Sequence, residues 1–151
     1  MDNEANTARG AVPGAVAAAV RKLHHELGIP LSQLTSADFR FLTRLHYCAA
    51  DVDVRGGRTG WGEHEMDYIL FVKADVSLSP HADEIQATCY VGPAELKRMM
   101  RPDSGLQWSP WFRIIADNFL FRWWADLDAV LTAQAHADWS TIHKLDCKVE
   151  E

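Results

Sequence analysis

The chain has 151 residues, of which 48% are hydrophobic and 24% charged, and its formal net charge is −6. This length and balance are typical of one soluble globular domain. Nucleic-acid binding needs a basic face that displaces counterions from phosphates, so the acidic net charge disfavours it. No apolar run reaches the roughly 18 residues that a membrane-spanning helix requires, so we expect no association with a membrane.

Cysteine content and the N-terminal residues indicate the compartment. The three cysteines, Cys48, Cys89 and Cys147, form no CxxC pair. Such an odd, sparse set argues against a disulfide framework and for a reducing compartment. The first four residues include two acidic ones and lack the basic, hydrophobic or Arg/Ser-rich character of signal and transit peptides. We therefore expect a cytoplasmic protein, while a peroxisomal or plastid location stays open.

The first part of the chain predicts a polar tail followed by a helix. Residues 1–10 are polar, and we expect them to be disordered. From about residue 11 to 27 the apolar side chains recur at helical spacing. Gly28 offers a left-handed stop, and Pro30 prevents the helix from resuming.

Alternating residues predict three strands in the middle of the chain. In residues 39–47 the period of two places Phe39, Phe41, Leu45 and Tyr47 on one face, and Arg40, Arg44 and His46 on the other. Residues 55–60 are glycine-rich and predict a connector. Residues 62–73 predict a second strand, residues 75–83 a loop, and residues 84–91 a third strand.

Two helices are expected after these strands. Pro93 begins a short helix that ends near Met100, because proline suits the first helical position. Ser109 as N-cap and Pro110 at the first position precede a helix to about Ala135. Its first four turns are apolar nearly all round, so they must be buried on several sides.

Together these elements predict an α+β fold, in which a partial mixed sheet packs against helices that include a long buried C-terminal helix. The domain would span residues 11–136, with tails at 1–10 and 137–151. Three strands are a thin sheet for so much aromatic helix surface. Either the chain oligomerises or part of the fold is absent.

A row of acidic residues stands out in the second strand. Along W-G-E-H-E-M-D-Y, the side chains of Glu63, Glu65 and Asp67 point to one face at spacings of about 6–7 Å. Like charges so placed raise each other's pKa unless a positive group lies among them. Carboxylates suit Mg²⁺ or Mn²⁺, and a mixed His/carboxylate set suits Mn²⁺ or Zn²⁺. His64 falls on the opposite face. The alternative is a solvated acidic edge that discourages strand pairing.

The end of the first helix has the shape of a degenerate sequence motif. R-K-L-H-H-E-L-G-I, residues 21–29, resembles the second half of a Nudix box, R-E-U-x-E-E-x-G-U, whose glutamates hold divalent cations on a diphosphate. Lys22 and His25 replace two of the three glutamates, so only Glu26 is left as a ligand. The alternative is an exposed turn that carries acid and histidine.

Five strings occur in order from about Gly14 to Leu127. They are L-H-H-E-L-G-I-P, F-L-T-R-L-H-Y, W-G-E-H-E-M-D-Y-I-L, C-Y-V and S-P-W-F-R-I-I-A-D-N-F-L-F-R-W-W. This combination resembles the type 1 isopentenyl-diphosphate isomerases of the Nudix superfamily. The resemblance implies conversion of isopentenyl to dimethylallyl diphosphate in isoprenoid biosynthesis, by protonation of an alkene and deprotonation of the resulting carbocation. It also implies Mg²⁺, with Mn²⁺ or Zn²⁺ as alternatives at a His/Glu site of the complete enzyme.

The same resemblance implies a role for each candidate residue. Glu65 would be the acid/base carboxylate and a metal ligand, and Glu63 a second metal ligand. Tyr47 would be hydrogen-bonded near the acid/base glutamate, Glu65. Trp111 would face the carbocation, which cation–π attraction stabilises. From residue type alone, both aromatic residues would instead be interpreted as core.

Two further residues would serve the substrate diphosphate. The resemblance implies that Glu26 helps to hold a Mg²⁺ on this group and that Lys22 approaches it. The family's catalytic cysteine, three metal-binding histidines and most diphosphate-binding basic residues precede the position of Gly14, and residues 1–10 contain none of these motifs.

We therefore expect this chain alone to be inactive, poorly soluble and able to self-associate through uncovered apolar surface. Two alternatives are a Nudix-type pyrophosphohydrolase and a non-catalytic shortened isoform that binds an intact subunit through residues 110–131.

Overall fold

The computed structural model describes residues 12–52 and 58–146, with side chains described outside 49–61 and up to Leu145. The predicted N-terminal tail and residues 55–57 of the predicted connector lie outside these ranges. Residues 58–60 belong to a strand.

Helix α2 (Pro13–Leu27) forms as the sequence predicts. Proline occupies its first turn, and Gly28 ends it in the left-handed region at φ 64°. The amide of Gly28 donates to the carbonyl of Leu23, which satisfies one of the free carbonyls at the helix end. Two short 3-10 turns follow, η1 (Leu31–Gln33) and η2 (Ser36–Asp38).

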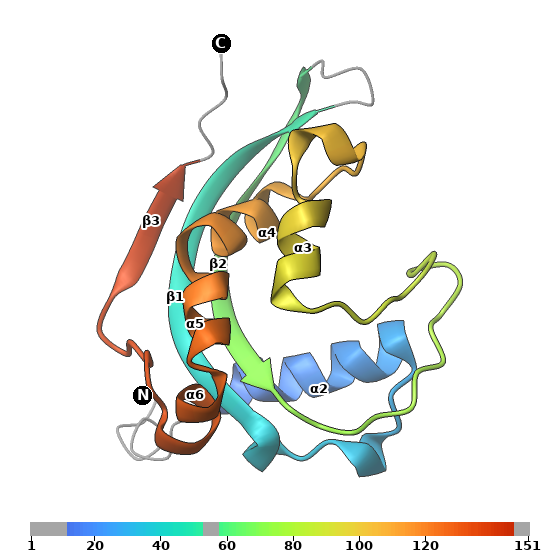
Figure 1. Cartoon of the computed structure of the whole chain (residues 1–151), viewed down its shortest axis with the longest axis vertical. Helices are drawn as coiled ribbons and strands as arrows, with labels where there is room; N and C mark the ends of the chain where they lie inside the picture. Colours follow the sequence, from blue (N-terminus) through green and yellow to red (C-terminus); the bar gives the residue numbers. More distant parts are fainter. Residues whose placement is uncertain (1–11, 53–57, 147–151) are drawn as a thin grey trace.

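A three-stranded mixed sheet forms the centre of the fold (Figure 1). Strands β1 (Phe39–Val52) and β2 (Arg58–Val72) pair antiparallel. Strand β3 (Ile142–Asp146) pairs parallel with the other edge of β1, which gives the order β2-β1-β3. The α+β class and the mixed sheet are confirmed. The sequence did not predict β3, which lies in the segment expected to be a C-terminal tail.

A bulge in β1 corrects the predicted strand faces. Phe41 pairs with Leu70 and Thr43 with Ile69, so Leu42 is an extra residue on this strand. Because such an insertion reverses the alternation, Phe39 and Phe41 lie on the face opposite Leu45 and Tyr47. All four are buried, because helices or loops cover both faces of the sheet.

The predicted third strand, residues 84–91, is wrong. These residues follow the loop 75–83 without pairing to any strand in the described part of the chain, and most of their side chains are exposed. Alternating residues become a strand only where a neighbour accepts their hydrogen bonds.

The helical region after this loop is less regular than the sequence predicts. Helix α3 (Pro93–Met99) is confirmed, and a short turn, η3 (Pro102–Ser104), follows it. The predicted continuous helix is divided into α4 (Pro110–Ile115), a π-helical segment η4 (Ala116–Leu120), α5 (Phe121–Ala125) and α6 (Leu127–Ala133). Asp126, at φ −104° and ψ 25°, separates the last two. Ser109 accepts the amide of Arg113 through its carbonyl, 3.1 Å away, and not through its hydroxyl.

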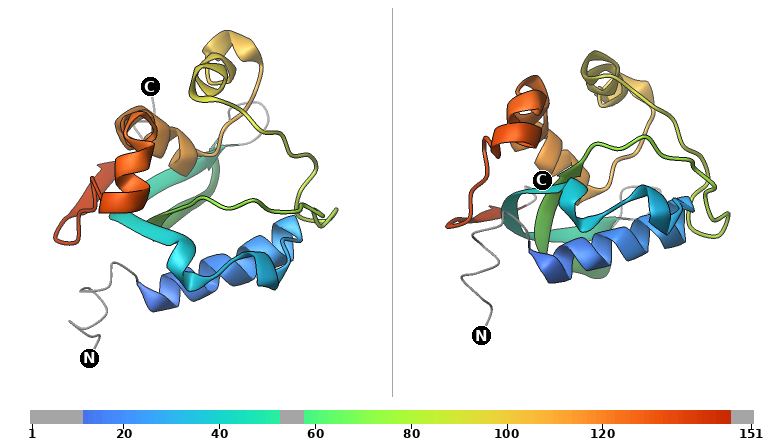
Figure 2. Two further views of the ribbon diagram at one scale, coloured as in Figure 1. Left: turned by 60° about the horizontal axis from the view of Figure 1, so that its bottom comes forward. Right: turned by 90° about the horizontal axis from the view of Figure 1, so that it is seen from below.

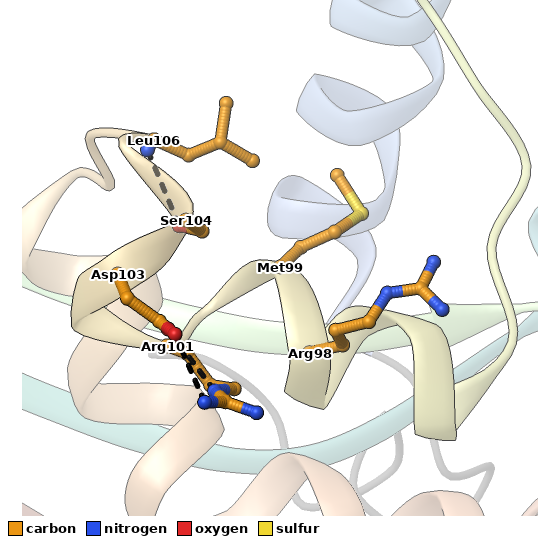
Figure 3. A pocket seen from close by; sticks show the side chains of 6 residues that line it. All are labelled: Arg98, Met99, Arg101, Asp103, Ser104 and Leu106. Atoms are coloured by element: carbon orange, nitrogen blue, oxygen red, sulfur yellow. Dashed lines mark hydrogen bonds and ion pairs between the residues drawn. The ribbon is translucent and has the colours of Figure 1, made fainter.

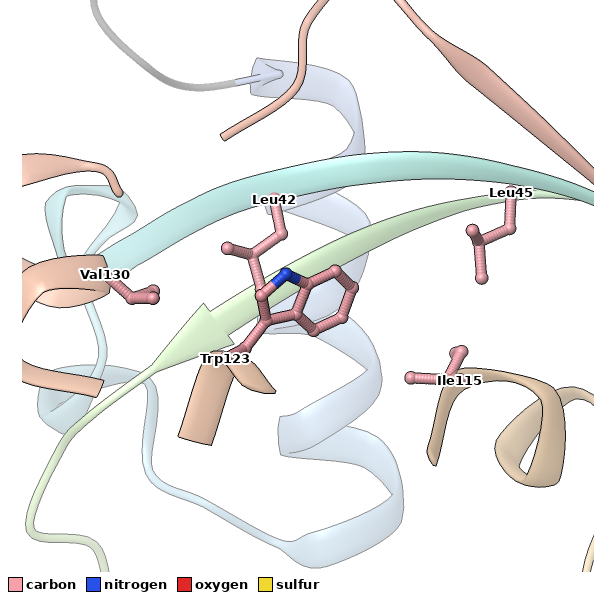
Figure 4. Close-up of a cluster of buried hydrophobic side chains, with 5 residues drawn as sticks. All are labelled: Leu42, Leu45, Ile115, Trp123 and Val130. Carbon is pink, nitrogen blue, oxygen red and sulfur yellow. The ribbon is translucent and has the colours of Figure 1, made fainter. Parts of the chain in front are cut away.

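The main core lies between β1 and the helices α4–α6. Figure 4 shows its five buried side chains, which come from the strand and from three helical segments: Leu42, Leu45, Ile115, Trp123 and Val130. Helix α2 lies on the other side of the sheet (Figure 2). A second cluster joins α3 to α4 and η4 and is built from Leu96, Met100 and Ala116. The sheet is therefore placed between two helical layers.

Candidate active site

The register of the β1–β2 hairpin assembles the carboxylate row. Tyr47 lies opposite Glu65 and Leu45 opposite Asp67, while Glu63 is two residues before Glu65. Paired residues share a face, so the acidic side chains lie on the side that faces α4 and α5, together with Tyr47. The sequence prediction that Glu63, Glu65 and Asp67 share one face is confirmed.

Tyr47 is the buried anchor of this row. Its ring is 2% exposed, and its hydroxyl donates a 2.7 Å hydrogen bond to Oε2 of Glu63. Burial first, and then the hydrogen bond to Glu63 and the nearby negative charges, raise the pKa of Tyr47 far above its usual range. Tyr47 therefore stays protonated and orients Glu63 through this hydrogen bond.

Asp67 is the partly buried carboxyl of the row. Burial raises the pKa of Asp67, and the charges of Glu65 and Glu63 add to this effect. This repulsion within the row is the one expected from three like charges on one strand face. Sequence reasoning gave Asp67 no catalytic role, although the period of two already placed it beside Glu65.

Trp111 closes a pocket over these carboxylates. A cavity of about 250 Å³ is lined by Glu65, Asp67, Tyr68, Ile69 and Trp111. Trp111 follows Pro110 in the first turn of α4 and remains 41% exposed. Its ring meets that of Phe112 edge to face, with centroids 5.6 Å apart. Trp111 is therefore not a core residue, and its indole lies at the pocket beside Glu65.

The two residues expected to serve the diphosphate lie elsewhere. Lys22 and Glu26 form an ion pair one turn apart on α2. The carbonyl of Glu26 accepts the amide of His81 at 2.9 Å, which fastens the loop 75–83 to the helix end. Neither residue lines the pocket at Trp111, because α2 and α4 lie on opposite sides of the sheet (Figure 2).

The described residues alone do not make a complete metal centre. Among the side chains that the structure describes, those of residues 12–48 and 62–145, no three His, Cys, Asp or Glu are grouped so as to hold a metal ion. Glu26 is therefore not brought into one site with Glu63 and Glu65. The two strand carboxylates are oxygen donors of the kind that Mg²⁺ accepts, but its octahedral site needs more ligands than these two.

A larger pocket at the end of α3 does not resemble an active site. Its volume is about 440 Å³, and Figure 3 shows the lining side chains, Arg98, Met99, Arg101, Asp103, Ser104 and Leu106. Arg101 donates two hydrogen bonds to Asp103, of 3.0 and 2.9 Å, and Arg98 pairs with Glu95 at 3.2 Å. Both arginines already have an anionic partner.

The fold and the sequence now place this chain in a class. Residues 13–112 match the NUDIX domain family, so the chain belongs to that family. Among the residues described, no helix is both long and apolar enough to cross a membrane.

Within that class, the chain is similar to isopentenyl-diphosphate delta-isomerases. It is 44% identical to the enzyme of Gibberella zeae over 83% of this chain and 47% of the relative. The corresponding values are 46%, 82% and 51% for the enzyme of Schizosaccharomyces pombe. For isopentenyl-diphosphate Delta-isomerase 1 of Mesocricetus auratus they are 40%, 87% and 55%. The chain spans about half the length of the curated relatives it matches.

Proposed function

We propose that this chain forms the carboxylate part of an isopentenyl-diphosphate isomerase site, acting on a small diphosphate in isoprenoid biosynthesis. One observation carries the proposal. Glu65 lines a pocket with Trp111, and the neighbouring Glu63 accepts a hydrogen bond from Tyr47. The similarity to named isomerases supports the same assignment.

In the proposed chemistry each side chain has one role. Protonation of the terminal alkene carbon of isopentenyl diphosphate gives a tertiary carbocation, and loss of a proton from the carbon nearer the diphosphate gives the dimethylallyl isomer. Glu65 carries out one of these transfers as a general acid or base. The Trp111 ring stabilises the cation through its π face. Tyr47 keeps Glu63 in place, since it remains protonated.

The second proton transfer, on the other side of the alkene, and the binding of a divalent metal ion both need groups beyond this pocket. Glu65 and Asp67 lie on the same strand face, so an acid/base on the other side of the alkene has to come from elsewhere. A divalent cation, Mg²⁺ or alternatively Mn²⁺ or Zn²⁺, would take Glu63 and Glu65 as ligands and would offset the charge of the row. For these reasons we propose that the 151-residue chain has no detectable turnover by itself.

A chimera tests the proposal. Residues 13–146 would replace the matching segment of the Schizosaccharomyces pombe relative, which is 46% identical to this chain. We expect the chimera to convert isopentenyl diphosphate in the presence of Mg²⁺, followed by proton NMR. Glu65→Gln should lower kcat by about 10²–10⁴-fold, the usual contribution of a positioned acid or base.

The control is Glu95→Gln, which removes an exposed carboxyl on α3 and should leave the rate unchanged. A folded chimera that is active with Glu65→Gln would contradict the role of Glu65. Substantial turnover by the purified 151-residue chain would contradict its proposed inactivity.

The cytoplasm is the compartment that we propose for this activity. Cys48 and Cys89 are both free and exposed, which fits a reducing environment. A fluorescent fusion to the chain should distribute through the cytosol; accumulation in plastids or peroxisomes would contradict this.

A further inference from the structure

Two histidines meet on the sheet face opposite Glu63, Glu65 and Asp67. His46 of β1 pairs with Met66 and His64 of β2 pairs with Cys48, so the two histidines are diagonal neighbours on one face. Their Nε2 atoms are 2.8 Å apart, and their ring centroids are 4.7 Å apart at an angle of 58°. The contact is partly exposed, and the pocket at Trp111 lies on the other face.

We propose that His46 and His64 form a binding site for Cu²⁺ or Ni²⁺. Imidazole nitrogens are the ligands that these borderline ions prefer among side chains. In the contact one Nε2 donates its proton and the other accepts it. When both rings carry their proton on Nδ1 instead, both Nε2 lone pairs are available to a cation placed at the point between them. A cation at that point replaces the shared proton, and neither neutral ring has to lose a proton.

The separation of the two nitrogens decides between metals. At metal–nitrogen distances of about 2.0 Å, two nitrogens 2.8 Å apart subtend about 90° at the metal. This is the angle between neighbouring ligands in a square-planar complex, the geometry of Cu²⁺ and of many Ni²⁺ sites. A tetrahedral Zn²⁺ would need the nitrogens about 3.3 Å apart. The pair as it stands therefore fits Cu²⁺ and Ni²⁺ better than Zn²⁺.

The surroundings limit the strength of the site. Among the side chains that the structure describes, residues 12–48 and 62–145, no third His, Cys, Asp or Glu joins the pair. Lys144 of β3 lies beside His46 in the parallel register and is exposed. Its positive charge opposes a cation at the pair. Replacing Lys144 by alanine should therefore raise the affinity for the metal.

Isothermal titration of the 151-residue chain with Ni²⁺ tests the site. We expect binding of one ion, with the affinity lowered at least tenfold by His46→Gln and by His64→Gln, and raised by Lys144→Ala. The matched control is His25→Gln, because the His25 ring stacks on His81 with centroids 5.7 Å apart and no contact between ring nitrogens is formed. Circular dichroism establishes that each variant is folded.

A second measurement needs no variant. In chain labelled with ¹⁵N-histidine, sub-stoichiometric Cu²⁺, which is paramagnetic, should broaden the signals of His46 and His64 before those of the other histidines. Equal broadening of all histidines, or an affinity that is unchanged in both glutamine variants, would overturn the proposal. Zn²⁺ bound as tightly as Cu²⁺ would contradict the 90° geometry. None of these outcomes depends on isomerase activity, since the carboxylates point away from the pair.

Discussion

At the scale of single residues, the hydrogen bond from Tyr47 to Glu63 is the contact on which the carboxylate row depends. The Tyr47 hydroxyl is buried, whereas Glu63 is exposed and can bind water in its place. Tyr47→Phe keeps the ring in the core and removes only the donor. We therefore expect the free energy of unfolding, measured in urea, to fall by about 1 kcal/mol.

The control for this substitution is Tyr68→Phe, on the opposite face of the neighbouring strand. Tyr68 is 42% exposed, so the loss of its hydroxyl should change the stability by less than about 0.5 kcal/mol. Equal losses of unfolding free energy in the two variants would show that the Tyr47 hydrogen bond stabilises the fold no more than an exposed hydroxyl does.

The same residues show how much of the candidate site could be predicted from the sequence. The period of two was enough to place Glu63, Glu65 and Asp67 on one face, because an extended strand leaves no other choice. It was not enough to place Trp111, whose position beside Glu65 depends on how α4 crosses the sheet. That expectation came from the resemblance to a family. The pairing of Lys22 with Glu26 follows from their spacing of four, whereas their diphosphate role was implied only by the resemblance to a family.

At the scale of elements, local sequence signals predicted where helices begin and end better than they predicted the interiors of helices and strands. Proline at the start of α3 and α4 and glycine after α2 were correct, since they fix backbone angles by themselves. The bulge at Leu42, the π segment after Ile115 and the strand β3 were missed. Each depends on a neighbour that is distant in sequence: β2 sets the bulge, the core sets the π turn, and β1 supplies the partner for β3.

Gly28 joins two elements and permits a direct test. It has φ of 64°, and a Cβ at this position would collide with the carbonyl oxygen of Ser79, in the loop that is hydrogen-bonded to the end of α2. Gly105 has φ of 72° but open space around it. Gly105→Ala should therefore cost only the left-handed strain, about 1 kcal/mol, whereas Gly28→Ala should cost clearly more. Thermal unfolding of both variants measures the difference. Equal losses would mean that the loop moves aside without cost.

The turn that leads into β3 depends on Asp138. Its carboxylate accepts the amides of Ser140 and Thr141 at 3.1 and 2.9 Å, while its own amide donates to the carbonyl of Leu42 at 2.6 Å. Hydrogen bonds from Thr141, and then those from Ser140, hold the pKa of Asp138 well below its ordinary value of 3.8, against a smaller opposing effect of burial. The ionised form is therefore the one that the folded state prefers.

This lowered pKa predicts the pH dependence of Asp138→Ala. A carboxyl whose pKa falls on folding contributes stability above its unfolded pKa and loses it as the pH drops toward the folded pKa. The wild-type chain should be more stable than the variant at pH 7, and this advantage should shrink progressively below pH 3.8. Urea unfolding of both chains between pH 7 and pH 2 measures it. A difference that stays constant over this range would contradict the role of the charge.

At the scale of the whole molecule, two hydrophobic clusters share one helical segment. The cluster of Leu42 and Trp123 joins the sheet to the helices, while the cluster of Leu96 and Met100 joins α3 to α4 and η4. Leu120 packs against both. Among the residues described, the cluster that contains α3 includes no strand residue, and Leu120 connects it to the cluster on the sheet. We infer that α3 can open while the sheet remains folded.

Two leucine-to-alanine substitutions separate these clusters. Leu42 is 0% exposed and Leu96 is 5% exposed, so both remove the same atoms from buried positions. Leu42→Ala should lower the free energy of global unfolding by about 2–5 kcal/mol and speed amide hydrogen exchange throughout β1 and β2. Leu96→Ala should speed exchange in α3 and leave the slowest amides of β1 unchanged, because α3 does not contribute to the cluster that holds the strand. If Leu96→Ala speeds exchange in β1 as much as in α3, the two clusters unfold as one unit, and the pocket at Trp111 would then depend on α3 as much as on the sheet.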